Sequence, residues 1–351
     1  MSPGSSPPAA PADGCLAALA GFDLMTVQRL RVLLSHHEPV EAHAVAIGRA
    51  VPHPSVARLL TPTIRAAWRA SADRRDPAEW AARCRMHEIR VISMRDDSYP
   101  AVLINDPEPP AALFVRGDLA VLDSRRVGVV GTRNATQAGR DIAFELGRDL
   151  AAAGVVVVSG LAKGVDGAAH AGVLRADGAP PAAVVGNGPD EPYPRVHARL
   201  WEEVCEHGVL LSEWPPGTVP EPFRFPLRNR ILAALSEVLV VIESRERGGS
   251  LITAQAAIER SIDVMAVPGS VRNRAAAGTN QLLRDGAAPS RPSTTCSSRS
   301  GSTLAGPGRR ATTPGRCREA PLPQCWSGAG EIRARWKRSS SSWVCPCRTR
   351  R

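Results

Sequence analysis

The chain has 351 residues and a formal net charge of +10 at neutral pH, a balance that usually indicates a nucleic-acid partner. The charge is uneven: residues 290–351 hold 13 Lys and Arg against 2 Asp and Glu, whereas residues 1–289 hold 31 against 32. The net charge therefore describes the C-terminal segment and excludes a generally basic body. Any basic surface within residues 1–289 has to be local.

The sequence offers no support for a membrane protein or a metalloprotein. No apolar run approaches the ~20 residues that a membrane span needs. The three cysteines of the body, Cys15, Cys84 and Cys205, are far apart and lack metal-type spacing. Scattered reduced thiols are typical of the cytosol, so we expect a cytoplasmic protein without a metal, a cofactor or a membrane segment.

The N-terminal part is predicted to be helical after a short lead-in. Residues 1–14 are rich in Pro, Ser and Ala, lack the features of a signal peptide, and are expected to be disordered. Residues 15–88 are predicted to form a helical domain. Helical spacing runs through Leu16–Leu34, which has a Gly-Phe-Asp break, and through Val56–Ala72 and Pro77–His87. Two short helices around such a break resemble a helix-hairpin-helix or SAM-like module; a generic helical cap on the next domain is the alternative.

Residues 89–289 are predicted to form an α/β domain. Short strands at Ile89–Ile92 and Ala112–Val115 flank a proline-rich loop, the expected seam between the domains. Strands and helices then alternate, which is typical of a doubly wound, mostly parallel sheet. The predicted strands are Val127–Val130, Val155–Ser159, Ala182–Val185, Val209–Ser212, Val238–Ile242 and Val264–Val267, and the first two helices between them are Gln137–Ala153 and Val165–Arg175.

Glycine-rich loops follow four of these strands. They are Gly131–Arg133, Ser159–Asp166, Gly186–Gly188 and Glu243–Ser250. Glycines let the backbone approach a ligand closely, Arg133 and Lys163 add charge, and the carboxyl ends of parallel strands share one edge of the sheet. This pattern indicates a phosphate-rich ligand. Neither a dinucleotide-binding fingerprint nor a P-loop is present.

The stretch from Phe223 to Ala257 concentrates these features. Arg228, Asn229 and Arg230 stand at what the pattern predicts to be the start of a helix. The buried strand Val238–Ile242 follows, and a Gly-Gly-Ser turn then leads into a helix predicted over Leu251–Glu259. Arginines at a helix start and an anion-binding turn on the same sheet favour a phosphate site.

Evidence for catalysis is weak. Asp166 and His170 are four residues apart on one helix face and could form an acid–base or metal pair, although such residues more often cap a helix and fix the neighbouring loop. Glu213 and Glu243 each end a strand and could act as bases, but pairing with Arg228 or Arg230 is the simpler interpretation. No nucleophile elbow or Cys–His pair is present.

Several motifs together resemble the DprA/Smf family of bacterial DNA-processing proteins. They are GTR (131–133), SGLAKGVDGAAH (159–170), Tyr193-Pro194, LSEWPPG (211–217), FPLRNRILAALSEVLVVIES (225–244), GGSLITAQAA (248–257), AVPG (266–269) and GTNQLLRDGA (278–287). The resemblance spans Arg90 to Ala288, and the helical N-terminus resembles the family's SAM-like region. Thr132 and Gly248 stand where the family usually or often has serine, and both still permit close backbone approach.

The resemblance implies an extended Rossmann-like domain that dimerises and binds single-stranded DNA without known catalysis. It further implies a protein that protects incoming single-stranded DNA and loads the RecA recombinase during natural transformation. By the same resemblance, the DNA groove is lined by Arg133, Lys163, Arg228, Asn229 and Arg230. It is shaped by Gly131, Thr132, Ser159, Gly160, Gly164, Gly249, Ser250 and Thr253.

Aromatic residues make up only 4% of the chain, and Tyr193, Phe223 and Phe225 are the candidates for base stacking. We therefore expect sequence-tolerant binding dominated by the phosphate backbone. If Arg228 and Arg230 contact phosphates, replacing both with alanine should weaken binding and flatten its salt dependence.

Residues 290–351 depart from this pattern. Ser, Pro, Arg and Cys dominate, and a disordered basic tail is one interpretation. A shifted reading frame is the sharper one. Back-translation of Ser293–Ser302 with GC-ending codons, moved by one base, yields an ordinary amphipathic segment, and a winged-helix-like domain often found in the family would then be lost.

Two other functions remain open from the residues alone. One is a nucleotide-processing enzyme of the LOG phosphoribohydrolase type, whose glycine-rich phosphate motif is matched only loosely by GGSLITAQAA (248–257). The other is an adaptor that engages only RecA or itself. Release of free base from a nucleoside monophosphate would indicate the enzyme, and failure to bind oligo-dT would favour the adaptor.

Overall fold

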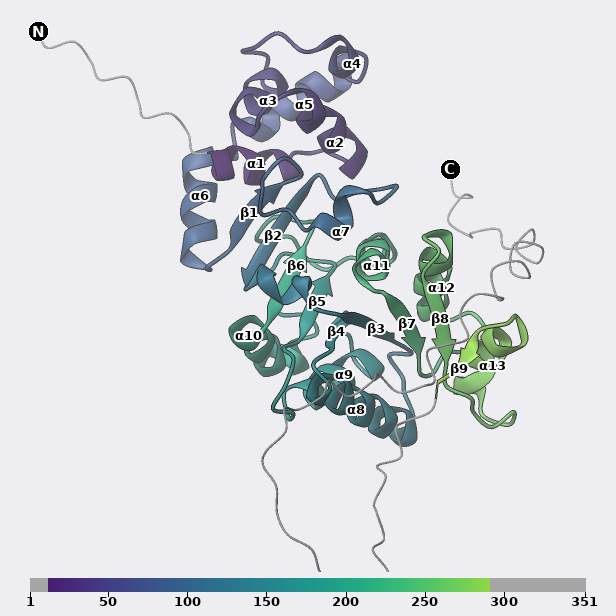
Figure 1. Cartoon of the computed structure of the whole chain (residues 1–351). Coiled ribbons are helices and arrows are strands. Elements are labelled where there is room, and N and C mark those ends of the chain that lie inside the picture. The colour runs from purple at the N-terminus through teal and green to yellow at the C-terminus, as the bar shows by residue number, and fades with distance from the viewer. Residues whose placement is uncertain (1–11, 291–351) are drawn as a thin grey trace, which may run out of the picture.

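The computed structural model describes residues 12–290 (Figure 1). The predicted disorder of residues 1–11 and the predictions for residues 291–351 therefore lie outside the described part. Within it, helix α1 begins at Ala12, so the expectation that residues 12–14 are disordered is wrong. Gly14 and Cys15 are buried in that helix, against α6 of the same region.

Six helices form the N-terminal region. Their starts follow simple rules, because Thr26, Thr61 and Asp76 accept hydrogen bonds from the first turns of three of them, and proline occupies the first turn of four. Leucines and Trp68 of these helices form one hydrophobic cluster. The helices are α1 (Ala12–Ala20), α2 (Val27–His36), α3 (Pro39–Ala46), α4 (Pro54–Ala57), α5 (Pro62–Ala72) and α6 (Pro77–Met86).

A β-hairpin joins this region to the rest of the molecule. Strands β1 (Arg90–Ser93) and β2 (Ala112–Gly117) pair antiparallel, and alternate residues point to opposite faces. Ala112 and Phe114 belong to the helical cluster, whereas Leu113 and Val115 belong to the main core. The hairpin at the predicted seam thus contributes to both hydrophobic cores.

The central sheet has nine strands in the order β1-β2-β6-β5-β4-β3-β7-β8-β9. Only the pairs that involve β2 are antiparallel. From β3 the chain moves outward through β4, β5 and β6, and then returns to place β7 on the other side of β3. The remaining strands are β3 (Arg126–Val130), β4 (Val156–Ser159), β5 (Ala182–Val185), β6 (Val209–Ser212), β7 (Val238–Val241), β8 (Asp263–Ala266) and β9 (Ala288–Pro289).

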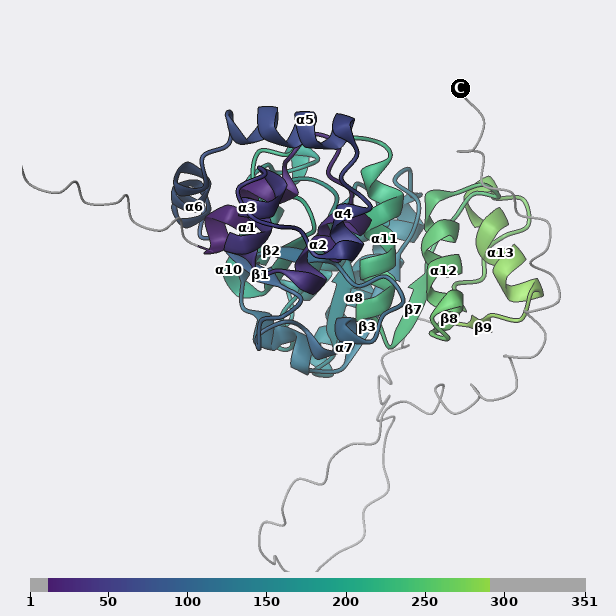
Figure 2. The same ribbon diagram turned by 90° about the horizontal axis from the view of Figure 1, so that it is seen from above.

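Helices cover both faces of this sheet (Figures 1 and 2). Two clusters on one face involve α8 (Gln137–Ala152), α9 (Val165–Val173) and α10 (Ala198–His207). The main core lies on the other face, under α7 (Ala101–Ile104), α11 (Arg224–Leu235), α12 (Gly249–Glu259) and α13 (Ala277–Arg284). The predicted fold class, a doubly wound, mostly parallel Rossmann-like sheet behind a small helical region, is confirmed.

Two predicted helix starts are wrong. Helix α11 begins at Arg224, so Arg228–Arg230 lie in its second turn and not at its start. The reason is that Pro226 occupies the first turn, where a proline costs no hydrogen bond. Helix α12 begins at Gly249, two residues before the predicted start.

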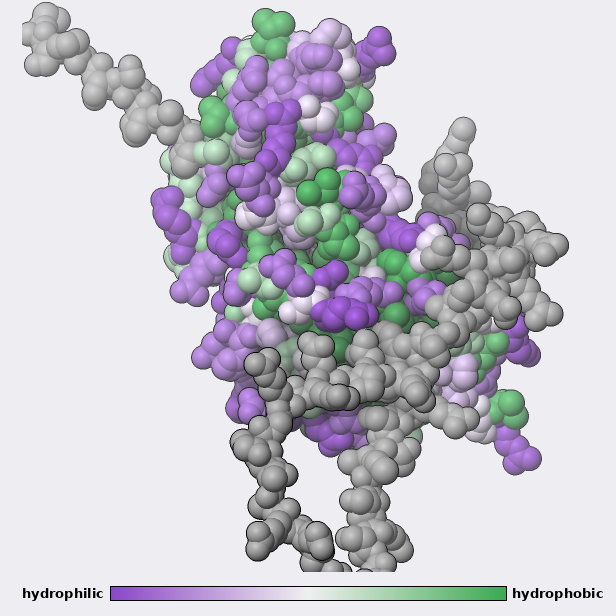
Figure 3. All heavy atoms as spheres, in the orientation of Figure 1, coloured by the Kyte–Doolittle hydropathy of each residue, from purple (hydrophilic) through white to green (hydrophobic). Residues whose placement is uncertain are grey.

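None of the described helices has the combined length and hydropathy that crossing a lipid bilayer requires. The face shown in Figure 3 is largely hydrophilic, with hydrophobic side chains gathered near the position of α7 in Figure 1. Val102 and Ile104 of α7 are among the exposed large apolar residues.

Candidate functional site

A pocket of about 180 Å³ opens at the carboxyl ends of β3, β4 and β5. Three loops and the first turn of α11 line it, and the loops are the first three of the four glycine-rich loops of the sequence. The lining contains two cations and no acidic residue, so the pocket suits an anion. It consists of Arg133, Asn134, Gly160, Ala162, Lys163, Val185, Gly186, Asn187, Tyr193, Pro194 and Phe225.

One wall of the pocket is aromatic. The rings of Tyr193 and Phe225 are 5.6 Å apart, and the Arg133 guanidinium carbon lies 4.5 Å from the Phe225 ring centre. This cation–π contact orients the exposed arginine before a ligand binds. A free side chain would lose the same conformational entropy only on binding. Tyr193 is 38% exposed, so its ring is available to a flat ligand. Tyr193 and Phe225 had been proposed as stacking residues, whereas the third, Phe223, is not part of the lining.

The loop after β4 forms the floor of the pocket. Leu161 and Gly164 both have left-handed backbone conformations, with φ of 53° and 80°, and full burial of the Leu161 side chain holds it in place. The Asp166 carboxylate accepts hydrogen bonds from the backbone N–H groups of Gly160 and Ala162. Asp166 therefore fixes the loop, as one of the two interpretations of its position expected. The helix cap is Gly164.

Burial changes the protonation of both polar residues on α9. Desolvation raises the pKa of Asp166 to about 6, although Arg228 and Arg133 oppose the change. Desolvation lowers the pKa of His170 to about 4, and its Nε2 donates to the Ala182 carbonyl 3.2 Å away. His170 is consequently neutral, with an Nδ1 that has no partner among the described residues. Two residues held in this way serve the structure of the loop.

Arg228 lies beneath the pocket floor. Its side chain is buried, Nη1 donates to the Val184 carbonyl at 2.6 Å, and a Cβ on Gly160 would stand 1.9 Å from the same nitrogen. Burial lowers the pKa of Arg228 to about 10, and Asp166 opposes this decrease. Arg228 remains charged at neutral pH, so it adds positive potential from below without being exposed.

Arg230 is part of a buried ion pair. Its Nη2 lies 2.5 Å and 2.6 Å from the two carboxylate oxygens of Glu213, and the side chains are 10% and 3% exposed. This confirms the simpler interpretation of Glu213. An arginine whose guanidinium is committed to a buried carboxylate presents little charge to a phosphate. The structure therefore places Arg230 in the core and away from the pocket lining.

Glu243 does not pair with Arg228 or Arg230, so that expectation is wrong. Its carboxylate accepts from the backbone N–H and the hydroxyl of Thr136, the N-cap of α8. Its carbonyl accepts from the Thr132 N–H at 2.8 Å. These contacts link the chain segments that follow the neighbouring strands β3 and β7, the point at which the strand order reverses direction. Ligands usually bind in the crevice at this point in such folds, but here the pocket lies beside it.

The remaining predicted residues fall into two groups. Gly131, Thr132, Ser159 and Gly164 hold the pocket loops together: a Cβ on Gly164 would stand 2.3 Å from the Thr132 carbonyl, and the Ser159 hydroxyl donates to Val129. The second group, on the β7–α12 side, is outside the lining. Gly249 is exposed, Ser250 donates to Ser244, Thr253 is buried, and Asn229 is half-buried on α11. Of the thirteen residues predicted for the site, Arg133, Gly160 and Lys163 line the pocket.

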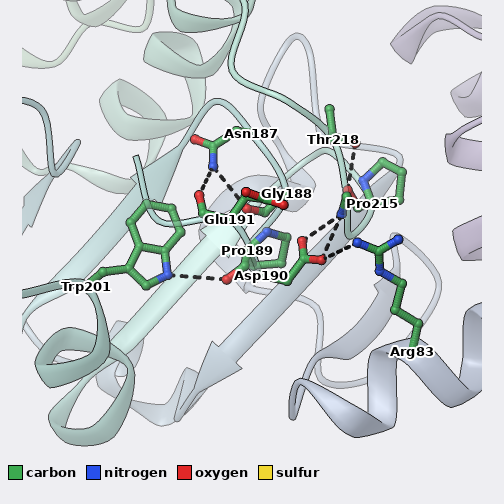
Figure 4. Close-up of polar contacts among 10 residues, drawn as sticks. Arg83, Asn187, Gly188, Pro189, Asp190, Glu191, Trp201, Pro215 and Thr218 are labelled. Carbon is green, nitrogen blue, oxygen red and sulfur yellow. Dashed lines mark hydrogen bonds and ion pairs between the residues drawn. The ribbon is translucent and has the colours of Figure 1, made fainter. Parts of the chain in front are cut away.

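The loop after β5 was underestimated. It contributes Gly186, Asn187, Tyr193 and Pro194 to the lining, and none of these is among the thirteen residues predicted for the site. The Asn187 side chain donates to the carbonyls of Gly188 and Glu191, which closes the loop on itself (Figure 4). An asparagine between two glycines after a buried strand was the available signal. Within residues 12–290, no group of His, Cys, Asp and Glu is arranged to hold a metal ion.

Comparison with known proteins identifies the family. A family model described as DNA recombination-mediator protein A matches residues 90–298. DNA processing protein DprA of Bacillus subtilis is 41% identical over 200 residues, 57% of this chain and 67% of that protein. Protein Smf of Escherichia coli is 39% identical over 198 residues, 56% of this chain and 53% of that protein. The chain thus spans about half of the E. coli relative and two thirds of the Bacillus one.

Two solved structures are also similar. The crystal structure of DprA from Streptococcus pneumoniae superposes with a TM-score of 0.66 at 30% identity and covers 78% of this chain and 92% of that one. A structure of DprA from Helicobacter pylori, described by its single-stranded DNA binding mode, gives a TM-score of 0.52 at 28% identity and covers 57% of this chain and 91% of that one. The chain belongs to the DNA recombination-mediator protein A family.

Proposed function

We propose that this protein binds single-stranded DNA through the pocket, protects the incoming strand and delivers it to RecA. The observation that carries the proposal is the convergence of Arg133 and Lys163 with the rings of Tyr193 and Phe225 in a pocket without acidic residues. Cations that contact phosphates and aromatic rings that stack on bases are the two features of sequence-tolerant single-strand binding. A Helicobacter relative is described as binding single-stranded DNA.

The pocket supplies few stacking surfaces, so the phosphates dominate the binding energy in this proposal. Each phosphate of a single strand that the protein neutralises adds about 0.7 to the slope of log K against log salt. Arg133 and Lys163 are both exposed at the pocket, and each can contact one phosphate. Two phosphates held beside two rings would fix a short stretch of strand without reading its sequence.

A salt titration of oligo-dT binding tests the proposal. For the variant Arg133→Ala/Lys163→Ala, we expect weaker binding and a slope smaller by about 1.4 than that of the wild type. The matched control is Arg125→Ala/Arg148→Ala, which also removes two charges. Arg125 directly precedes the start of β3 and Arg148 lies near the end of α8, so both are at the opposite edge of the sheet. Full-length chains are compared throughout, so that residues 291–351 contribute equally.

An equal decrease in slope for both pairs would contradict the proposal, because it would show a general charge effect. An unchanged slope for the Arg133 and Lys163 variant would remove the pocket from the DNA path. A parallel titration with duplex DNA separates a single-strand site from general affinity for polyanions.

RecA loading, a homodimer and a cytoplasmic location are further parts of this proposal. They follow from the family resemblance, and within residues 12–290 Cys15, Cys84 and Cys205 are buried and free, which fits a reducing compartment. Val102 and Ile104 of α7 are exposed apolar residues, which fits a protein contact. Light scattering that gives the mass of one chain would contradict the dimer, and unaccelerated RecA filament formation on coated DNA would contradict loading.

A LOG-type phosphoribohydrolase is the alternative function, and no specific observation favours it. The β7–α12 turn that suggested it contributes no residue to the pocket lining. Incubation with nucleoside monophosphates, followed by chromatography for free base, separates an enzyme from a binding protein without catalysis.

A further inference from the structure

The loop that carries Tyr193 is held by a residue of the N-terminal helices. Asp190, three residues before Tyr193, accepts a hydrogen bond from the Gly217 N–H, with its two carboxylate oxygens 2.7 Å and 2.9 Å from that nitrogen. Nη2 of Arg83 lies 2.8 Å from the same carboxylate (Figure 4). Arg83 belongs to α6, so this contact joins regions 107 residues apart in the chain.

The Asp190 carboxylate is buried. Its side chain is only 2% exposed, whereas that of Arg83 is 39% exposed. Among the described residues, Arg83 is the one cation that forms an ion pair with Asp190. A buried carboxylate that loses its cation is strongly disfavoured, so the position of the Asp190 loop depends on the presence of Arg83.

Steric contacts restrict this arrangement further. A Cβ on Gly188 would stand 2.6 Å from an Asp190 carboxylate oxygen, and one on Gly217 would stand 2.6 Å from Nη2 of Arg83. Gly217 also has a φ of 75°, which side chains rarely adopt. The backbone therefore comes close enough for the carboxylate to reach α6 and the loop after β6 at once.

The other hydrogen bonds of this loop connect it to the sheet domain, whereas the bond from Arg83 connects it to the helical region. Gly188 donates to the Thr218 carbonyl, and the Trp201 indole donates to the Pro189 carbonyl at 3.3 Å. Both partners belong to the sheet domain. Because the loop presents Asn187 and Tyr193 to the pocket, a displacement at Asp190 would move the aromatic wall.

We infer that Arg83 and Asp190 are positioning residues through which the N-terminal helices set the shape of the DNA pocket. The inference rests on the proposed function only for its consequence, the strength of DNA binding. The contact itself is a property of the free protein and can be tested without DNA.

Hydrogen–deuterium exchange of the free full-length protein is the primary test. We expect Arg83→Gln to accelerate exchange in peptides covering 187–193 and 217–218 by about tenfold, while peptides covering 131–134 keep their rates. Arg83→Lys keeps a cation for the single hydrogen bond and should restore most of the protection. Arg74→Gln is the matched control, because Arg74 pairs with Asp23 in the same helical region and both side chains are more than half exposed.

A double variant separates an electrostatic role from simple packing. In Arg83→Gln/Asp190→Asn, no buried charge is left without a partner, so exchange should be slower than in Arg83→Gln alone. If Arg83 acted only by filling space, the second substitution would increase the exchange further. That result, or equal effects of Arg74→Gln and Arg83→Gln on residues 187–193, would overturn the inference.

Oligo-dT binding measures the consequence. We expect about threefold or greater weakening in Arg83→Gln, because only the fraction of molecules with an ordered loop can bind tightly. An unchanged affinity despite faster exchange would show that the loop does not control the pocket. Wild-type protein that binds no oligonucleotide would contradict the proposed function, while the exchange data would still decide the contact between Arg83 and Asp190.

Discussion

Asp166 and His170 lie one turn apart on α9, and burial shifts their pKa values in opposite directions. Asp166 normally ionises near 3.8 but does so at about 6 in the folded protein. Its contribution to stability is therefore complete below pH 3.8 and is lost as the pH rises to about 6. His170 normally ionises near 6.5 but does so at about 4 when folded. Its contribution is complete above pH 6.5 and is lost as the pH falls to about 4.

Single substitutions should reveal the two opposing contributions. We expect His170→Leu to destabilise the protein more at about pH 7 than at about pH 4, by roughly 2–3 kcal/mol. Asp166→Asn should show the opposite trend, with a smaller cost at about pH 7 than at about pH 4. Urea unfolding followed by tryptophan fluorescence measures both. Parallel curves for the two variants would contradict the assignment of these residues as a buried pair with opposite shifts.

Residue types in the sequence indicated which positions carry charge, but burial decides which of these charges are exposed at the pocket. Arg133 and Lys163 follow strands directly, and the parallel sheet brings them to one edge, so their proximity was predictable. Arg228 and Arg230 have the same charge but are both buried on α11, where they bind the Val184 carbonyl and the Glu213 carboxylate. Nothing in the local pattern distinguishes an arginine that binds a phosphate from one that pairs with a distant glutamate. Substitution of Arg230 is therefore expected to lower the stability of the folded protein.

At the level of elements, glycines of the same predicted role have different environments. Gly160 follows β4, and a Cβ there would collide with the Arg228 guanidinium, which Val184 already binds. Gly249 begins α12, and a Cβ there would meet nothing within 4 Å. Both glycines belonged to the site predicted from the sequence, but only Gly160 has a steric reason to be glycine.

Alanine substitutions test this difference. We expect Gly160→Ala to cost about 1–3 kcal/mol through overpacking and to weaken oligo-dT binding as Arg228 moves. Gly249→Ala should be neutral or stabilise by up to about 1 kcal/mol, because alanine favours a helix and restricts the unfolded chain. Chemical denaturation and DNA titration of the pair provide the measurement. A comparable loss of oligo-dT affinity in both variants would mean that the β7–α12 turn also contacts the bound DNA.

The elements themselves were largely predictable, because strands buried on both faces read as continuous valine-rich runs. Helix starts were less so. Helix α11 begins four residues before the predicted start at Arg228, because Pro226 in its first turn loses no hydrogen bond. The loop after β5 was the larger omission. Its Gly-Asn-Gly start gave a local signal for a turn, but its contacts with Arg83 and Thr218 come from distant parts of the sequence, so the local pattern did not indicate its path.

At the scale of the whole molecule, the domain boundary predicted between residues 88 and 89 falls beside a hairpin that contributes to two hydrophobic cores. The β1–β2 hairpin gives Phe114 to the helical cluster and Leu113 to the main core. Arg83 and Asp190 add an ion pair across the same boundary, and Arg95, just after β1, pairs with Glu38 of the helical region. A hairpin that packs on both cores couples the two regions, because each core loses buried contacts when the hairpin detaches.

Unfolding should therefore be cooperative across the boundary. Leu33 of α2 and Leu211 of β6 are fully buried, one in each core, and their alanine variants should each lose about 2–5 kcal/mol. We expect hydrogen exchange at increasing urea to show both regions opening at one free energy, lowered equally by either variant. Independent domains would behave differently: Leu33→Ala would loosen the N-terminal helices and leave β4 and β5 protected. The coupling also bears on function, because helices that unfold together with the sheet can hold the Asp190 loop for as long as the pocket exists.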